Sequence, residues 1–381
     1  MQNLNCLIFV ILIVYFGSCA EPGSDGNESL SHSYFEINIP DDLHVSGMIP
    51  ADSVFSAVSY IPLEYNSDAV LSECEQIKLF IEEDLIYVLD LRQRVVVCFS
   101  SDGKHLKTLA RRGRGPDEYS RVGDLFVDSG TIYLLCESPE QIVVYDKDHN
   151  YVKRISLPFD ATSFAKSNSL FYIHTKVNRE EKYAVHIIDS NGVVLNKYMT
   201  FEELSIPNNL QSMWVHNGAV YAEFANDYSV YELTKEGSRV YATLDFGKDN
   251  LPTEAKNWGN YMSDKTADYV RQNNYRPPQG LGNVFVNDQY LIVQYVGFLL
   301  RRSLIWNKVT GEIYDKAISN TEDFPVVQGT RFRWLIDNKL YTLTPAGMIS
   351  RLVENGYGNF PQEIAAITPD DNFILTIYTL K

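Results

Sequence analysis

The residues that could do chemistry gather in one short stretch, RRGRGPDEY, which begins at Arg111. Three guanidinium groups fall within four positions of this stretch, and an acid and an aromatic ring follow them. Guanidinium groups bind carboxylates through paired, charge-assisted hydrogen bonds, so the stretch could hold an acidic ligand or a sugar. The candidate ligand-binding residues are Arg111, Arg112, Arg114, Glu118 and Tyr119.

The same stretch also fits a purely structural role. Gly113 and Gly115 allow the backbone to approach its neighbours closely, and Pro116 stiffens the chain. Glu118 could accept hydrogen bonds from nearby amides or from an arginine, which would tie the loop to itself. The sequence leaves both interpretations open.

Other reactive patterns are missing from the sequence. It contains no GxxxxGK[ST], HExxH, GxSxG or CxxC pattern, and its seven histidines are scattered singly. We therefore predict no catalytic residues, no metal ligands and no cofactor.

The elements that position the stretch are β-strands. From Ile86 the sequence IYVLDLRQRVVVCFSSDGKHLKTL alternates β-branched and aromatic residues and turns at Asp102-Gly103, which is typical of an antiparallel meander. Six such segments, each interpreted as the second strand of a blade, begin at Ile86, Ile132, Leu170, Val220, Tyr290 and Lys339. We therefore predict an all-β fold, a six-bladed β-propeller of four-stranded antiparallel blades.

A second periodic signal supports six blades. Gly and Asn tolerate the positive φ of a tight turn, so they mark the hairpin between the two outer strands of a blade. The positions are Gly103, Asn150, Gly192, Gly237 and Gly311. The first four are spaced by about 45 residues, the length of one blade.

The last interval is longer, because a segment of different character lies within it. Between about residues 252 and 276, aromatic and apolar residues recur at helical spacing, and Pro277-Pro278 ends the pattern. We predict a short helical insert between blades four and five. It would pack on a propeller face or, as the alternative, cover the central channel.

The two ends of the chain are predicted to close the ring. The final strand, Phe373 to Leu380, has no outer partner, and Tyr60 to Leu63 is a strand-like segment without a blade. Pairing the two would remove both exposed edges, which favour aggregation. The propeller should thus span residues 55–381.

The segments YIPLE, IYVLD, DGK, RRGRGPDEY and DDNFILTIYTLK together resemble the six-bladed β-propeller lipoproteins of Gram-negative envelopes, relatives of NHL-repeat propellers. The resemblance covers nearly the whole mature chain. Its most specific piece is similar to that family's G-x-G-P-G-E-Y loop, with Asp117 where the family has glycine. Aspartate fits this position less well if the glycine has a positive φ. The resemblance implies a propeller at the cell envelope and no agreed activity.

The N-terminal segment predicts export. Residues 7–16 (LIFVILIVYF) form an apolar run too short to cross a bilayer, and Gly17-Ser18 and Cys19 follow it. We predict a signal peptide over 1–18, lipid attachment at Cys19, and a lipidated flexible tether over 19–54. An ordinary secretory signal is the alternative. The expected location is the cell envelope, at the outer membrane.

Export exposes the remaining cysteines to oxidation, so their pairing has to be considered. The mature chain has Cys74, Cys98 and Cys136 besides Cys19, and three cannot all pair. Cys98 and Cys136 lie within strand-like segments, where a free thiol packs as a small apolar side chain. We expect no structural disulfide.

The formal net charge of −16 disfavours nucleic acid as a partner, because the chain would repel a phosphate backbone. The expected partners are the membrane, through the N-terminal lipid, and a glycan, a peptide or another protein. A binding or interaction module without enzymatic activity is the preferred interpretation. The alternative is a propeller-type hydrolase or lyase with a metal ion at the central channel, because a fold alone does not decide function.

Overall fold

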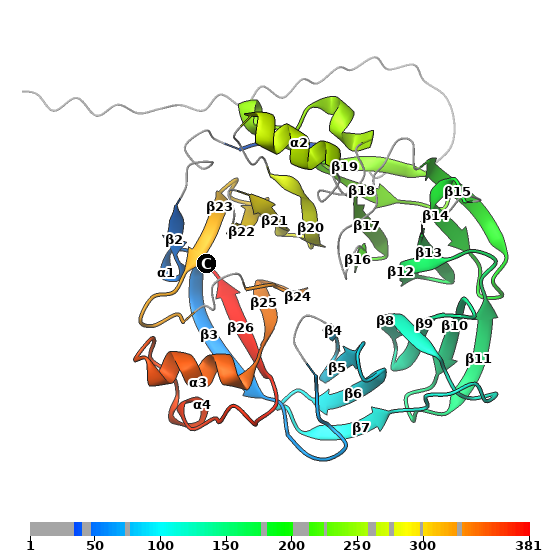
Figure 1. Cartoon of the computed structure of the whole chain (residues 1–381), viewed down its shortest axis with the longest axis horizontal. Coiled ribbons are helices and arrows are strands. Elements are labelled where there is room, and N and C mark those ends of the chain that lie inside the picture. The colour runs from blue at the N-terminus through cyan, green and yellow to red at the C-terminus, as the bar shows by residue number, and fades with distance from the viewer. Residues whose placement is uncertain are drawn as a thin grey trace, which may run out of the picture. The chain divides into compact units, whose positions relative to one another are not determined.

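Six sheets follow one another around a ring in the computed structural model of the chain (Figure 1). Four sheets have four strands and two have a fifth strand added. The four strands of each blade are antiparallel, which confirms the predicted six-bladed propeller. The structure describes residues 34–39, 47–72, 77–176, 181–200, 213–224, 227–257, 264–273, 278–297, 300–325 and 330–381.

Each blade runs from an inner strand at the ring centre to an outer strand at the periphery (Figure 1). The inner strands of blades one to six are β4 (Ile77–Glu82), β8 (Arg121–Asp128), β12 (Ala161–Ser167), β16 (Met213–His216), β20 (Gln279–Val286) and β24 (Trp334–Ile336). The second strands are β5 (Leu85–Asp90), β9 (Thr131–Glu137), β13 (Leu170–Thr175), β17 (Ala219–Glu223), β21 (Tyr290–Gly297) and β25 (Lys339–Thr344). The third strands are β6 (Val95–Ser100), β10 (Gln141–Tyr145), β14 (Tyr183–Ile188), β18 (Ser229–Leu233), β22 (Leu300–Asn307) and β26 (Ile374–Leu380). The outer strands are β7 (His105–Leu109), β11 (Tyr151–Ser156), β15 (Val194–Thr200), β19 (Ser238–Asp245), β23 (Ile313–Ser319) and β3 (Phe55–Pro62).

The hydrophobic core lies between neighbouring blades. Leu89 of blade one and Leu134 of blade two belong to one buried cluster, and Ile142 of blade two and Ile173 of blade three to the next. A strand that is covered on both faces has a nearly continuous run of apolar residues in its sequence. This is why all six segments predicted as second strands occupy that position in a blade.

The ring closes through the two ends of the propeller. β3 pairs antiparallel with β26, with Pro62 opposite Ile374 and Phe55 opposite Leu380. The predicted pairing of the N-terminal segment with the C-terminal strand is therefore confirmed. Blade six consists of one strand from the start of the fold and three from its end.

The folded body begins before the predicted boundary at Phe55. β1 (Phe35–Asn38) pairs in parallel with β19, and β2 (Met48–Pro50) pairs in parallel with β23, so each adds a fifth strand to a blade. A short helix, α1 (Ala51–Val54), leads into β3.

The predicted flexible tether over 19–54 is therefore wrong for residues 34–39 and 47–54. The physical reason is burial, because Ile37, Ala51 and Val54 join the core of the adjacent blades. The signal peptide over 1–18 and Cys19 lie outside the described residues.

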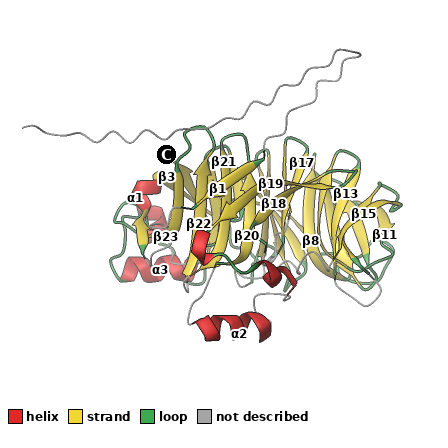
Figure 2. Ribbon diagram, turned by 90° about the horizontal axis from the view of Figure 1, so that it is seen from above, coloured by secondary structure: helices red, strands yellow, loops and turns green. Residues whose placement is uncertain are grey.

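The predicted insert between blades four and five is present. It contains the 3-10 turns η3 (Gly247–Asp249) and η4 (Thr253–Asn257) and the helix α2 (Asp264–Asn273). Figure 2 shows α2 beyond one face of the ring. A second helical segment, α3 (Ala346–Glu354) and α4 (Gln362–Ala365), joins β25 to β26 and was not predicted.

The outer hairpins of blades one and three pack closely against the preceding blade of the ring. A Cβ atom on Gly103 would lie 2.2 Å from the carbonyl oxygen of Pro62, and one on Gly192 would lie 2.8 Å from that of Ser156. Both glycines also have positive φ, as does Gly311. Glycine is needed at the first two positions for close approach as well as for the turn.

The prediction of positive φ is wrong at two of the five hairpins. In blade two the left-handed residue is His149, with φ 64°, one position before Asn150. Gly237 in blade four does not have a positive φ, and a Cβ atom placed on it would have no described neighbour within 4 Å. A different turn type in each of these hairpins accounts for the difference.

The two described cysteines of the propeller are buried. Cys98 and Cys136 are free thiols, and burial raises the pKa of Cys98 to about 11 and that of Cys136 to about 12. Both therefore pack as small apolar side chains, as predicted. Cys74 lies outside the described residues.

Candidate functional site

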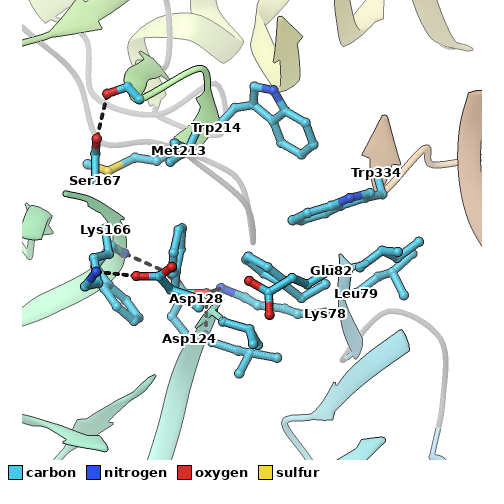
Figure 3. Close-up of a pocket in the computed structure, with 18 of the residues that line it drawn as sticks. Lys78, Leu79, Glu82, Asp124, Asp128, Lys166, Ser167, Met213, Trp214 and Trp334 are labelled. Carbon is cyan, nitrogen blue, oxygen red and sulfur yellow. Dashed lines mark hydrogen bonds and ion pairs between the residues drawn. The ribbon is translucent and has the colours of Figure 1, made fainter. Parts of the chain in front are cut away.

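A cavity of about 360 Å³ lies where the inner strands of five blades converge (Figure 3). It reaches the hairpins that join the first and second strands of blades three and four. The residues labelled in Figure 3 are Lys78, Leu79, Glu82, Asp124, Asp128, Lys166, Ser167, Met213, Trp214 and Trp334.

The side chains of the cavity are arranged in three levels along the inner strands. Successive side chains of a strand point to opposite faces, so residues two apart share a direction. The segments KLFIE (78–82) and DLFVD (124–128) each contribute a charged residue, a phenylalanine and an acid at this spacing. The cavity thus has a charged floor, aromatic walls and a charged rim.

The floor is a buried ion pair. Lys78 Nζ lies 2.6 Å from Asp124 Oδ1, and both side chains are about nine-tenths buried. The amide of Phe164 donates to Asp124 Oδ2 at 2.9 Å, and the amide of Leu125 donates to Oδ1. This carboxylate is satisfied by its own protein, and removing one partner of such a pair typically costs about 3–5 kcal/mol. The floor is structural.

The walls form an aromatic girdle, made of Phe80, Phe126, Phe164, Trp214 and Trp334. The ring centroids of Phe80 and Trp334 lie 4.4 Å apart, and those of Trp214 and Trp334 lie 4.7 Å apart. Phe126 lies 5.0 Å from Phe80 and 6.1 Å from Phe164. Edge-to-face and tilted contacts of this kind hold the rings in place.

The two tryptophans of the girdle differ in their polar atoms. The indole N–H of Trp214 donates to the carbonyl of Val286 at 2.8 Å, and the side chain is buried. Trp334 is half-buried, and no described residue accepts a hydrogen bond from its indole N–H. Trp334 therefore lines the cavity with its ring and keeps an indole N–H that is free to donate.

The rim contains three charged side chains with different partners. Lys166 forms an ion pair with Asp128 and also donates to the carbonyl of Asn168 at 2.7 Å. Glu82 accepts hydrogen bonds from two backbone amides of blade two, at 2.7 and 2.8 Å. Among the residues that the structure describes, no cationic side chain pairs with Glu82.

The stretch predicted as the ligand site lies elsewhere. It joins β7 to β8 and therefore enters blade two at Arg121, whereas Asp128 at the rim ends the same strand. The two ends of β8 are about 20 Å apart. None of the five predicted ligand-binding residues lines the cavity. Arg112 borders a second, more open hollow of about 640 Å³, which lies between β7 of blade one and the outer hairpin of blade two.

Most polar groups of this stretch are used within the protein. Arg111 forms an ion pair with Asp117, and Glu118 accepts a hydrogen bond from the amide of Gly115 at 2.7 Å. Asp117 does not have a positive φ, so the exchange of glycine for aspartate adds an ion pair without strain.

Tyr119 is the part of the prediction that the structure contradicts. Its side chain is 1% exposed, and its hydroxyl oxygen lies 2.8 Å from the carbonyl oxygens of Arg94 and Leu109. A ring buried among the strands of blades one and two cannot stack on a ligand from solvent. Arg112 and Arg114 remain exposed, and Arg112 donates to the carbonyl of Gln93 at 3.0 Å.

A family model described as "Domain of unknown function (DUF4934)" matches residues 34–379. The chain belongs to this family. The match begins at β1 and ends in β26, so it covers the whole DUF4934 propeller, including the two parallel strands. No curated protein matches the chain.

Two solved structures share the fold of this DUF4934 chain. A "Putative exported protein" from Bacteroides fragilis is 16% identical with a TM-score of 0.70, over 92% of this chain and 100% of that one. A member of the DUF4221 family from Bacteroides vulgatus is 12% identical with a TM-score of 0.50, over 86% of this chain and 97% of that one. At these identities the likeness shows the fold alone.

The alternative hypothesis of a metal ion at the central channel needs a cluster of donor side chains in the DUF4934 chain. Within the described residues, no group of three His, Cys, Asp or Glu side chains is placed to hold a metal ion. The same residues contain no helix long and apolar enough to cross a membrane.

One signal for the cavity is present in the sequence and was missed. KLFIE and DLFVD repeat the same charged and aromatic spacing in two successive inner strands. Trp214 and Trp334 belong to no repeated sequence pattern, because each is one aromatic residue within a short strand. The ring brings them together across more than a hundred residues of sequence.

Proposed function

We propose that this protein is an exported, lipid-anchored binding module of the cell envelope that holds its ligand in the central cavity. The observation that carries the proposal is the aromatic girdle, whose members Phe80, Phe126 and Trp334 are only partly buried at the centre of the fold. A ring surface kept open to a cavity costs hydrophobic free energy that a ligand can recover.

The size and chemistry of the cavity support a small ligand. Its volume of about 360 Å³ is at the lower end of the range for ligand pockets. A single sugar ring or one large side chain of a peptide would fill it. A sugar offers an apolar face to the girdle and hydroxyl groups to the indole N–H of Trp334 and to the rim.

The experiment is calorimetry on the chain without residues 1–19, against monosaccharides, disaccharides and short peptides. Trp334→Ala should abolish binding of any ligand found, whereas Trp334→Phe should weaken it only partly. Tyr357→Ala is the control, because Tyr357 is an exposed aromatic residue outside the cavity. A ligand that binds Trp334→Ala as tightly as the parent would place the site elsewhere.

Export and anchoring belong to the same proposal. Gly17, Ser18 and Cys19 directly follow the apolar run, and the Bacteroides fragilis protein of the same fold carries the description of an exported protein. One acyl chain gives only marginal membrane binding, so several chains on one cysteine are expected. Cys19→Ala should release the protein from the membrane fraction of the cell. Retention there would refute lipid attachment at Cys19.

A further inference from the structure

We propose that the ligand of the central cavity carries an organic ammonium group, which lies between the aromatic girdle and the carboxylate of Glu82. This inference rests on the proposed function, because it takes the cavity as the binding site. It adds to that proposal the sign of the charge that the ligand carries.

The charges that line the cavity do not cancel. Two lysines and three acids face it. Lys78 pairs with Asp124 and Lys166 pairs with Asp128, so Glu82 is the acid left without a cation among the described residues. An opposite charge brought by a ligand would compensate this carboxylate through a charge-assisted contact.

The carboxylate of Glu82 is held in a fixed position. Its Oε1 accepts the amide of Ser129 at 2.7 Å and its Oε2 accepts the amide of Gly130 at 2.8 Å. Because a carboxylate can accept about four hydrogen bonds, each oxygen keeps capacity for a further donor. In Figure 3 Glu82 projects into the space between Asp128 and Trp334. The acceptor is thus preorganised, which lowers the entropic cost of binding.

The girdle supplies the second half of a cation site. Phe80 is two residues before Glu82 on β4, so both side chains point to the cavity, and the ring of Trp334 lies 4.4 Å from that of Phe80. Aromatic faces attract ammonium groups, and tryptophan does so most strongly. Combining such rings with one carboxylate is the arrangement that recognises alkylated ammonium groups.

A neutral ligand would explain only part of the cavity. Ring surfaces suit a neutral sugar equally well, but a sugar leaves the charge of Glu82 uncompensated. The formal net charge of −16 adds a field that attracts cations towards the protein. The observations therefore favour an ammonium group, whether on a compact alkyl body, an amino sugar or a lysine side chain.

The test is calorimetry with matched pairs of probes that differ in the ammonium group. Choline is compared with its neutral isostere 3,3-dimethylbutan-1-ol, glucosamine with N-acetylglucosamine, and a lysine-containing tripeptide with its acetyl-lysine form. At least one ammonium probe should bind, and its neutral partner should bind at least tenfold more weakly. The pair that shows the largest difference identifies the source of the ammonium group.

Two variants separate the contribution of Glu82 from general electrostatics. Glu82→Gln should weaken binding of the ammonium probe at least tenfold. Glu83→Gln makes the same charge change one residue later, at an exposed position outside the cavity, and should change affinity less than twofold. Unchanged melting temperatures would show that both variants remain folded.

The outcomes distinguish the two proposals. If both members of every pair bind equally, or if Glu82→Gln binds as the parent does, the inference of a cation is wrong. The proposed function still stands in that case, provided that Trp334→Ala abolishes binding. If an ammonium probe binds and Trp334→Ala does not weaken it, both proposals fail. If only neutral compounds of the panel bind, the inference of a cationic ligand is wrong, but the cavity remains the proposed binding site.

Discussion

The loop from Arg111 to Tyr119 and the central cavity are both rich in charged and aromatic side chains, but they use them in opposite ways. In the loop, Arg111 is paired with Asp117 and the hydroxyl of Tyr119 meets two carbonyl oxygens. In the cavity, Glu82 keeps hydrogen-bonding capacity and the girdle is partly uncovered. The fold thus satisfies most polar groups of the loop within the protein, whereas it leaves an acceptor and ring surfaces of the cavity open.

The two regions also differ in how they are assembled. The loop lies within nine consecutive residues and is fastened to blade two, where Arg154 donates to the carbonyls of Gly115 and Glu118 at 2.6 and 2.7 Å. The cavity draws on five blades. Disturbing the ring should therefore destroy the cavity and leave the contacts inside the loop intact.

Deleting residues 371–381 should have the largest effect. It removes β26, so β3 and β25 lose their partner and blade six is lost. The exposed edges should cause aggregation, and any ligand binding should disappear. Size-exclusion chromatography and calorimetry measure the two effects. A truncated protein as soluble and heat-stable as the mature chain would contradict the role of this closure.

Tyr119→Ala should lower the free energy of unfolding strongly while leaving ligand affinity unchanged. Truncating a buried aromatic residue typically costs about 3–5 kcal/mol. Tyr119→Phe keeps the ring and removes the hydroxyl, so it should cost about 0.5–1.5 kcal/mol. Urea titration followed by fluorescence measures both. If the Tyr119→Ala variant stayed stable but bound the ligand more weakly, the loop would have to be part of the binding site.

Gly113→Ala tests how tightly Glu118 closes the loop. A Cβ at this position would lie 1.9 Å from Glu118 Oε2, so the carboxylate would have to leave the amide of Gly115. The expected cost is about 1.5–3 kcal/mol, the typical contribution of a hydrogen bond to a charged group.

The control for this variant is a double-mutant cycle. With Glu118→Ala already present, Gly113→Ala should cost much less, because the clash is gone. Gly237→Ala should be nearly neutral, since no described residue lies within 4 Å of its Cβ position. Additive losses at Gly113 and Glu118 would show that the two residues do not interact.

Arg112→Ala and Arg114→Ala should have the smallest effects. Both side chains are exposed, so each change should shift stability by less than about 0.5 kcal/mol. Neither should alter the affinity of a ligand of the cavity by calorimetry. A loss of affinity without a loss of stability would mean that the arginines bind ligand after all.

Most of the fold follows from the sequence, because it depends on local patterns. Strands such as VVVCFS and IYLLC are apolar on both faces, since each blade is covered by its neighbours, and their turns carry glycine or asparagine. Ring closure was predictable from the same physics, because a strand without an outer partner at Phe373 needs one.

Two strands were missed because they carry no local signal. β1 and β2 are short segments, FEIN and MIP, within a polar stretch, and their pairing is decided by the free edges of β19 and β23. The central cavity was not predicted, for the related reason that its residues are dispersed in the sequence. A dense cluster such as RRGRGPDEY is visible in sequence, whereas Trp214 and Trp334 meet only in space.

The pairing of β3 with β26 has a consequence for the timing of folding during synthesis. Ser56 and Thr379, which share a hydrogen bond across this pair, are 323 positions apart. At about 5–20 residues per second, a ribosome needs roughly 16–65 s to make that stretch. β3 is among the first strands of the propeller to be made, and its partner is the last. The ring can therefore close only after β26 has left the ribosome, so blade six is completed late in synthesis although one of its strands is made early.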